Sequence, residues 1–142
     1  DSHALYDLLQ LRISVFCVEQ NCPYQDADGK DQNAWHLLAY RTGELVGTAR
    51  VLMPGVSYPD ACSIGRVANR LDQRGQKVGQ QVMTQAVQQC ETLFPEFPIR
   101  IGAQKYLSRF YQQFGFEVMS EPYLEDGIVH VTMEKPPVSA VS

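Results

Sequence analysis

Residues 62–93 read CSIGRVANRLDQRGQKVGQQVMTQAVQQCETL, and this stretch decides the fold. Its first part, 62–69, predicts a β-strand. Its last part, 78–93, predicts a helix, because apolar residues recur there at helical spacing. A second strand is predicted at 99–103, IRIGA, after two prolines that end the helical segment. Because a strand–helix–strand unit needs a crossover connection, we expect the two strands to be parallel neighbours. The apolar stripe of the helix consists of Val78, Val82, Ala86, Cys90 and Leu93.

Further helices and antiparallel strands are predicted on both sides of this unit. Thr42-Gly43 separates two strands that should form a hairpin, and Gly115 stands where a left-handed residue would end a helix. We therefore expect an α/β fold of three layers, α/β/α, with a mixed, largely antiparallel sheet. One domain should span 1–135, and 136–142 should form a disordered tail. The other expected elements are helices at 3–18 (capped by Ser2) and 105–114, strands at 35–41, 44–53, 116–120 and 128–134, and loops at 20–34 and 121–127.

The composition is that of an ordinary globular chain, and it excludes several classes of protein. Lys and Arg total 12 and Asp and Glu total 16 in 142 residues, which gives a net charge of −4. A uniformly basic surface for nucleic acid or for an anionic membrane is therefore excluded. No apolar run reaches the roughly 18 residues that cross a bilayer. Four scattered cysteines are too few for a disulfide scaffold, and no signal-peptide pattern opens the chain, so we expect a reduced cytoplasmic protein.

The loop before the predicted helix has the properties of an anion site. Residues 74–79, RGQKVG, combine two glycines with the cations Arg74 and Lys77 at a helix N-terminus. Free N–H groups and the helix dipole favour an anion there, and glycine lets the backbone approach it closely. A plain strand–helix turn is equally compatible with these residues. The loop is not a P-loop, because Gly-Lys-Ser/Thr is absent, and it lacks the G-x-G-x-x-G pattern of dinucleotide loops.

Four segments, in order, resemble the GNAT N-acetyltransferases. Residues 64–83, IGRVANRLDQRGQKVGQQVM, resemble the acetyl-CoA motif, whose loop is Gln/Arg-x-x-Gly-x-Gly/Ala. Residues 103–116, AQKYLSRFYQQFGF, resemble the later motif that ends Phe-Tyr-x-x-x-Gly-Phe. LLQLRISVFCVEQNCPYQDADGKD at 8–31 and EDGIVHVTM at 125–133 look like the ElaA-type branch. The resemblance implies the GNAT fold, in which the central parallel strands splay to hold acetyl-CoA. The family's usual first strand is short or missing here.

The resemblance implies acetyl transfer from acetyl-CoA, as co-substrate, to an amine. Pantetheine would pair with the strand edge at Val67, Ala68 and Asn69. Lys77 departs from the motif, because it stands where the middle glycine usually does, and Gln104 stands where many relatives have Asn. The pyrophosphate would bind the backbone of Arg74, Gly75, Gln76, Lys77, Val78, Gly79 and Gln80.

Tyr111 matches the tyrosine that protonates the departing CoA thiolate in the family. Packing beside Phe110 is the alternative role for its ring. Glu19, at the end of the first helix, is our first choice for the base that takes the proton of the amine. His130 is the second choice, because an imidazole can act as a base near neutral pH. A chain of water molecules is a further alternative.

The acceptor amine should meet an acidic surface. Asp28 and Asp31, with Asp26 beside them, make an acidic loop that would attract a cation together with Glu125. A merely solvated loop is the alternative. His130 and His36 are further candidates for substrate contacts, and each could be structural instead. Arg50 and Arg66 lie inside strands, where they would order carboxylates or lie at the surface.

No metal site is expected. Cys17, Cys22 and His36 have poor spacing for zinc, and the 26–31 loop fails the EF-hand pattern. No Ser-His-Asp arrangement is evident, so direct transfer fits better than a covalent acyl-enzyme.

The sequence therefore favours an N-acetyltransferase that acts on a primary amine of a small molecule or peptide. A non-catalytic acyl-CoA-binding or regulatory module is the alternative, motivated by Lys77 and by the lack of a clear base. A structural domain without a ligand is the third hypothesis. Relatives often dimerise, which leaves a homodimer as an option.

Overall fold

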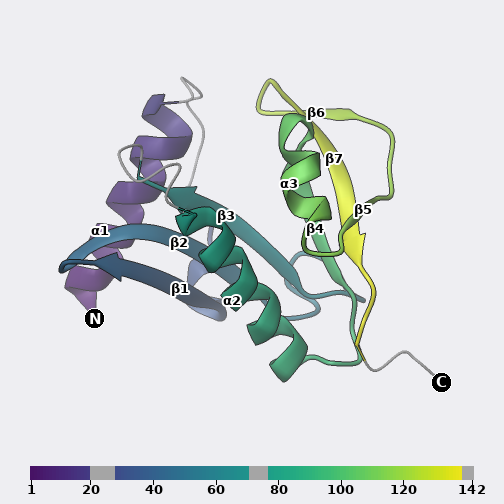
Figure 1. Ribbon diagram of the computed structural model, residues 1–142, viewed down its shortest axis with the longest axis horizontal. Helices are drawn as coiled ribbons and strands as arrows, with labels where there is room; N and C mark the ends of the chain where they lie inside the picture. The colour runs from purple at the N-terminus through teal and green to yellow at the C-terminus, as the bar shows by residue number, and fades with distance from the viewer. Residues whose placement is uncertain (20–27, 71–76, 139–142) are drawn as a thin grey trace.

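Two antiparallel sheets, joined at one point, organise the protein (Figure 1). The computed structural model describes residues 1–19, 28–70 and 77–138. The helical elements are α1 (Ser2–Ile13), the π-helix η1 (Ser14–Glu19), the 3₁₀ turn η2 (Asp31–Asn33), α2 (Val78–Leu93), the 3₁₀ turn η4 (Lys105–Leu107) and α3 (Ser108–Gln112). The strands are β1 (Ala34–Arg41), β2 (Glu44–Leu52), β3 (Ser63–Asn69), β4 (Ile99–Gln104), β5 (Glu117–Val118), β6 (Tyr123–Glu125) and β7 (Ile128–Lys135).

Among the described residues, the predicted parallel neighbours, β3 and β4, pair at one point, where each strand begins. One sheet has the order β1-β2-β3, and the other has the order β4-β7-β5, with β6 also paired to β7. Between them, the described residues form a single parallel bridge, from Cys62 to Ile99. There the Cys62 N–H donates to the Pro98 carbonyl (3.1 Å), and the Arg100 N–H donates to the Cys62 carbonyl (2.9 Å). The expected mixed, largely antiparallel arrangement with splayed central strands is confirmed: antiparallel ladders are joined by a parallel bridge, and β3 and β4 diverge in Figure 1.

A β-bulge in β3 accompanies this divergence. Arg50 pairs with Gly65 and Thr48 pairs with Ala68, so two residues of β3, Arg66 and Val67, oppose one residue of β2. Arg66 has a φ of 49°, which a side chain larger than glycine rarely adopts. Bulges bend and twist the strand that carries them. The bulge therefore lies where β3 turns away from β4.

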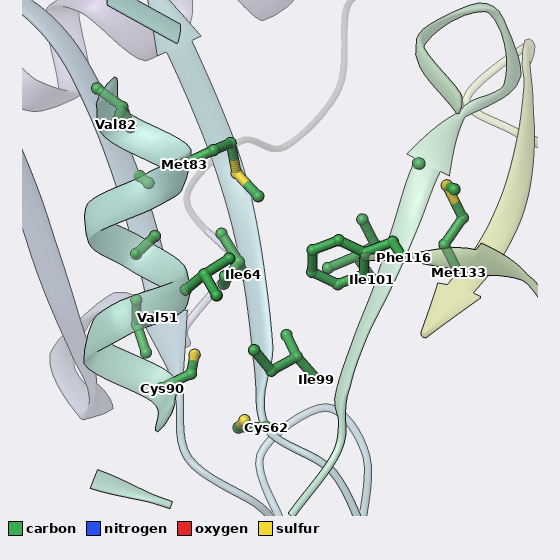
Figure 2. Packing of buried hydrophobic residues seen from close by; sticks show 14 of the residues in the cluster. Val51, Cys62, Ile64, Val82, Met83, Cys90, Ile99, Ile101, Phe116 and Met133 are labelled. Carbon is green, nitrogen blue, oxygen red and sulfur yellow. The ribbon is translucent and has the colours of Figure 1, made fainter. Parts of the chain in front are cut away.

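Helices cover both faces of the first sheet, so this part of the molecule has the expected three layers (Figure 1). The stripe of α2 is buried against the sheet as predicted, except that Leu93 is 39% exposed. Figure 2 shows Met83 of α2, with Ile64 of β3, on one side of this core and Phe116 on the other. On the opposite face of the sheet, Leu8 and Leu11 of α1 pack in a second cluster.

The N-terminal helix begins one residue earlier than expected. Asp1, and not Ser2, caps α1, because its carboxylate accepts a hydrogen bond from the Ala4 N–H (2.8 Å). The α-helix ends at Ile13 and continues as the π-helix η1. The predicted helix 105–114 is also shorter, because it divides into η4 and α3. Gly115 follows with a φ of 96°, which confirms its left-handed conformation.

Strand β6 lies inside the segment 121–127 that was predicted to be a loop. It pairs with β7 across Asp126-Gly127, whose φ values of 51° and 76° suit a tight hairpin turn. The predicted strand 116–120 shrinks to β5, although the Met119 N–H still donates to the Thr132 carbonyl (2.8 Å). The dipeptide Asp-Gly was the sequence signal for this hairpin.

An ion-pair network fastens the segment before β1 to the first sheet. Arg12 of α1 is fully buried and donates to Asp31 (2.7 Å). Arg50 of β2 donates to both oxygens of Asp28 (2.7 and 3.0 Å), and it also lies 3.3 Å from Asp31. Arg66 of β3 approaches the same Asp28 at 3.3 Å. The expectation that the strand arginines order loop carboxylates is therefore confirmed.

The network keeps both carboxylates ionised. Burial by itself would raise the pKa of Asp28, but hydrogen bonds from Arg50 and the Lys30 N–H, with the charges of Arg50 and Arg66, lower it well below its usual range. For Asp31, hydrogen bonds and charges from Arg12 and Arg50 likewise outweigh burial and lower the pKa. The same contacts raise the pKa of Arg50 against the effect of its burial.

Parts of two predicted segments lie outside the described residues. Residues 20–27, 71–76 and 139–142 lie outside the described part, and these include most of the predicted loop 20–34 and the end of the predicted tail. No helix in the described part is long and apolar enough to span a membrane.

The packing of α2 on β2 depends on the absence of a side chain at Gly47. A Cβ there would lie 2.8 Å from Val78 Cγ1 and 3.1 Å from Val82 Cγ2. Gly47→Ala should therefore lower the free energy of unfolding by about 1–3 kcal/mol, measured by urea unfolding. Gly65→Ala is the control, because a Cβ at Gly65 meets nothing within 4 Å. Equal stability of the two variants would contradict this packing.

The Asp28 contacts should make stability depend on pH. Its folded pKa lies below the unfolded value of about 3.9, so the stabilisation is complete above that value and is lost as pH falls toward the folded pKa. We expect Asp28→Asn to cost about 1–3 kcal/mol at pH 7 and progressively less below about pH 4, by chemical unfolding at each pH. Asp60→Asn, which removes a more exposed partner of Arg100, should change stability less. A loss that is independent of pH would refute the role of the charge.

Candidate functional site

A cavity of about 1100 Å³ lies between the diverging strands β3 and β4. Arg66, Val67 and Asn69 of β3 line one side, and Ile101, Gly102 and Gln104 of β4 line the other. Gly79 of α2, Phe110 and Tyr111 of α3 and His130 of β7 complete the wall. Elements far apart in the sequence therefore meet around one space. Its size is that of a small-molecule site.

The backbone edge of β3 faces this space. One edge pairs with β2, and the other meets β4, among the described residues, only at the Cys62–Ile99 bridge. An edge of this kind presents N–H and C=O groups to an extended ligand. Val67 and Asn69 are among the residues that line the cavity. Ala68 is buried in the cluster under α1, so it can contribute to the cavity only through its backbone.

The N-terminus of α2 opens onto the same cavity. Lys77 precedes the helix with a φ of 63°, and its own side chain makes no capping hydrogen bond to the first N–H groups. Gly79 lies against Asn69: a Cβ at this position would stand 2.8 Å from Asn69 Nδ2. Val78 is buried in the core, so it can offer only its backbone, and the exposed Gln80 amide donates to Gln113 (3.3 Å). Free N–H groups at a helix start suit an anion.

Tyr111 both packs in the core and lines the cavity. Its ring makes edge contacts with Phe110 (5.2 Å between centroids) and Phe116 (6.3 Å). Burial, and to a smaller extent the nearby phenol of Tyr106, raises the pKa of Tyr111 to about 12. The phenol is therefore protonated at neutral pH and can donate a proton inside the cavity.

The β6–β7 hairpin contributes a histidine and a carboxylate. His130 Nδ1 lies 2.8 Å from the Ile128 carbonyl, and Nε2 lies 3.7 Å from Glu125 Oε2. The imidazole stacks on Tyr123 at 5.9 Å between ring centroids. Both His130 and Glu125 line the cavity, as predicted for residues that contact an acceptor.

The acidic loop has a different environment from the one expected. Asp28 lines the cavity, but its carboxylate already forms ion pairs with Arg50 and Arg66. Asp31 does not line the cavity, and its carboxylate lies in the arginine network. His36 is also absent from the lining, and its Nε2 lies 2.9 Å from the Asp31 carbonyl. Asp31 and His36 thus make contacts outside the cavity, whereas the carboxylates of Glu125 and Asp126 belong to residues that line it.

Several predicted residues lie outside the described part. Arg74, Gly75 and Gln76 of the predicted phosphate loop are among them, as are Asp26 and Cys22. The side chain of Glu19 is also not described. Within the described residues, no group of three or more His, Cys, Asp and Glu could hold a metal ion.

Aromatic residues that the sequence analysis did not single out also line the cavity. Tyr123 lies over β4, where a Cβ at Gly102 would approach its hydroxyl at 3.1 Å. Burial and the neighbouring Tyr123 and Glu125 raise the pKa of Tyr58, partly offset by Arg100. If the sequence analysis had predicted the pairing of β6 with β7, it would have placed Tyr123 correctly. Phe16, Tyr58, Tyr106 and Tyr123 form this set.

Comparison with known proteins agrees with this geometry. Residues 8–136 match the profile of the acetyltransferase (GNAT) domain. The chain is 46% identical to protein ElaA of Escherichia coli over 138 residues, which cover 96% of this chain and 90% of that protein. The crystal structure of Escherichia coli ElaA superposes with a TM-score of 0.88, at 44% identity, over 95% of this chain and 91% of that chain.

Two further solved structures share the fold. An acyl-CoA N-acyltransferase from Pseudomonas aeruginosa has a TM-score of 0.86 and 44% identity, over 92% of this chain and 89% of that chain. A GNAT family acetyltransferase from Elizabethkingia anophelis, solved with acetyl-CoA bound, has a TM-score of 0.68 at 16% identity, over 90% and 89%. The last likeness concerns the fold alone. From the profile match and the identity to ElaA, we conclude that the chain belongs to the GNAT acetyltransferase family and is an acyltransferase.

Proposed function

We propose that the protein transfers the acetyl group of acetyl-CoA directly to a primary amine of a small molecule or peptide. The observation that carries this proposal is the cavity in which the β3 edge, the start of α2 and Tyr111 meet. Family membership supports the enzyme over a non-catalytic acyl-CoA-binding module. A likeness in fold to an acetyltransferase solved with acetyl-CoA supports the choice of acyl donor.

The donor would bind along β3 and across the start of α2. Pantetheine would form hydrogen bonds with the β3 backbone at Val67–Asn69, because that edge lacks a partner strand among the described residues. The pyrophosphate would accept hydrogen bonds from the first N–H groups of α2, near Gly79. Arg74, Gly75 and Gln76 would contribute to this contact, as the resemblance implies. An N–H of β3 could also stabilise the oxyanion that forms when the amine attacks.

Tyr111 would protonate the CoA thiolate as it leaves. Its raised pKa keeps the phenol protonated through the neutral range. In water, a phenol with so high a pKa would be a weak proton donor to a thiolate, because the pKa of a thiol is only about 8.5. The same burial, however, disfavours the thiolate and raises its proton affinity. Desolvation of both groups therefore keeps transfer between them feasible.

Direct transfer also agrees with the positions of the cysteines. Cys62 and Cys90 are free but fully buried in the core, and neither lines the cavity. The side chains of the other two, Cys17 and Cys22, are not described. Within the described residues, no nucleophile is paired with a base in the manner of an acyl-enzyme mechanism.

Removal of the Tyr111 hydroxyl should slow the reaction without preventing donor binding. We expect Tyr111→Phe to lower kcat about 100-fold, with little change in the affinity for acetyl-CoA, in an assay of thiol release. Tyr106→Phe is the matched control, because this phenol lines the same cavity and the residue is 73% exposed. Unchanged turnover of Tyr111→Phe at every pH would show that the ring acts only in packing.

Acetyl-CoA should stabilise the folded protein. At about 100 times its Kd, it should add about 2.7 kcal/mol, which raises Tm by several degrees in a thermal unfolding experiment. Arg74→Ala should weaken this shift, because the predicted phosphate loop loses a cation. Arg109→Ala is the control, since this exposed residue of α3 does not line the cavity. The absence of any shift at millimolar acetyl-CoA would contradict the proposed donor site.

A further inference from the structure

The orientation of the His130 ring defines which of its nitrogens carries the proton. Nδ1 lies 2.8 Å from the carbonyl oxygen of Ile128 on the same strand. A carbonyl can only accept, so Nδ1 must be the donor of this hydrogen bond. In the neutral ring Nε2 then holds the lone pair. The stack with Tyr123, at 23° between the planes, fixes the ring in this orientation.

The basic nitrogen lies on the opposite edge of the ring, next to a carboxylate. Nε2 is 3.7 Å from Glu125 Oε2, too far for a hydrogen bond but close enough for charge attraction. The His130 side chain is 11% exposed, and the Glu125 side chain is 60% exposed. A protonated amine in the cavity can therefore approach both groups at once.

Phenols and charged groups both line the cavity around His130. Tyr123 belongs to β6, as Glu125 does, and Asp126 lies in the turn between β6 and β7. The other elements that line the cavity contribute the phenols Tyr58, Tyr106 and Tyr111 and the charged side chains Asp28, Lys30, Arg50 and Arg66. The Arg100 guanidinium stacks over Tyr58 at 5.2 Å. Among the described residues, Glu125 is thus the carboxylate that lies 3.7 Å from Nε2, where it can stabilise a charged imidazole.

From this geometry we infer that His130 is the general base, accepting the proton of the acceptor amine at Nε2, and that Glu125 is a positioning residue for the resulting imidazolium. The inference rests on the proposed function and deepens it. It also indicates the acceptor, a primary amine that arrives as an ammonium ion, drawn to Glu125 and to the faces of the neighbouring rings.

The proton balance of the step is complete. An N–H bond of the ammonium breaks, and its proton moves to Nε2. The amine then forms a C–N bond with the thioester carbon, and the C–S bond breaks with its electron pair on sulfur. The sulfur takes a proton from Tyr111. The nitrogen loses its second proton, which returns through solvent to the Tyr111 phenolate. His130 releases its proton to solvent, so one turnover yields an amide, a thiol and one proton.

The tautomer can be measured without any acceptor. In ¹⁵N-labelled protein, long-range ¹H–¹⁵N spectra distinguish a ring protonated on Nδ1 from one protonated on Nε2. The chain has 3 histidines, and His130→Gln assigns the signal of interest. His36 is an internal reference, because its Nε2 faces the Asp31 carbonyl and it should show the opposite tautomer. We expect Nδ1–H for His130, and Nε2–H would overturn the inference.

Kinetics then test the role of the ring. Tyramine, cadaverine and a short lysine peptide serve as acceptor probes with acetyl-CoA. We expect His130→Gln to lower kcat about 100-fold and to remove the rise of kcat/KM through the neutral pH range, while the limb due to the amine itself remains. Glu125→Gln should lower kcat/KM about two- to fivefold, as for an exposed ion pair. His3→Gln, on the exposed start of α1, should leave the profile unchanged.

Chemical rescue separates a base from a structural histidine. Added imidazole should restore part of the activity of His130→Ala but none of the activity of Tyr111→Phe. A neutral limb that persists in His130→Gln, or the absence of rescue in a variant that still binds acetyl-CoA, would assign His130 a structural role. Failure of the proposed function has a different signature: the wild-type protein would then neither respond to acetyl-CoA nor acetylate any probe.

Discussion

The whole arrangement depends on one parallel bridge, between Cys62 and Ile99, at which the two sheets are joined. Beyond it the β3 backbone bulges at Arg66 and Val67, while β4 pairs with β7 along its other edge. Backbone groups that would otherwise be used in a ladder are then turned toward a cavity. The site therefore exists because the sheet is interrupted. The core beneath it, from Cys90 to Phe116, keeps the two halves together (Figure 2).

The interrupted sheet opens the site, whereas the arginine network forms one side of it. Arg12, Arg50 and Arg66 come from a helix and two strands, and they converge on two carboxylates of the segment before β1. Their pairing with Asp28 and Asp31 satisfies charges that burial would otherwise penalise. It also removes these carboxylates from the task of attracting an amine. The acidic character of the acceptor side then depends on the β6–β7 hairpin and its exposed Glu125.

Two aromatic or heteroaromatic side chains in the cavity are held by contacts that leave one polar atom available. The rings of Phe110 and Phe116 hold Tyr111, and its hydroxyl stays protonated because burial disfavours the phenolate. Tyr123 and the Ile128 carbonyl hold His130, which leaves Nε2 opposite. A protonated phenol from α3 and an imidazole from β7 thus line one cavity, as the proposed acid and base. Such fixed orientation is what acid–base catalysis requires.

Local patterns in the sequence were sufficient for the elements that one periodic face defines. The apolar stripe of 78–93 predicted the bounds of α2, and Thr42-Gly43 predicted the first hairpin. The motifs at 64–83 and 103–116 identified the family and directed attention to Tyr111. Strand β6 was missed because its three residues are too few for a periodic signal, although Asp126-Gly127 marked the turn. Which charged side chains remain available to a ligand depends on contacts between distant elements, which no local pattern reveals. The acidic residues near position 30 and Glu125 look alike in sequence, and their difference arises because buried arginines from distant elements reach Asp28 and Asp31, while Glu125 lies 3.7 Å from an imidazole.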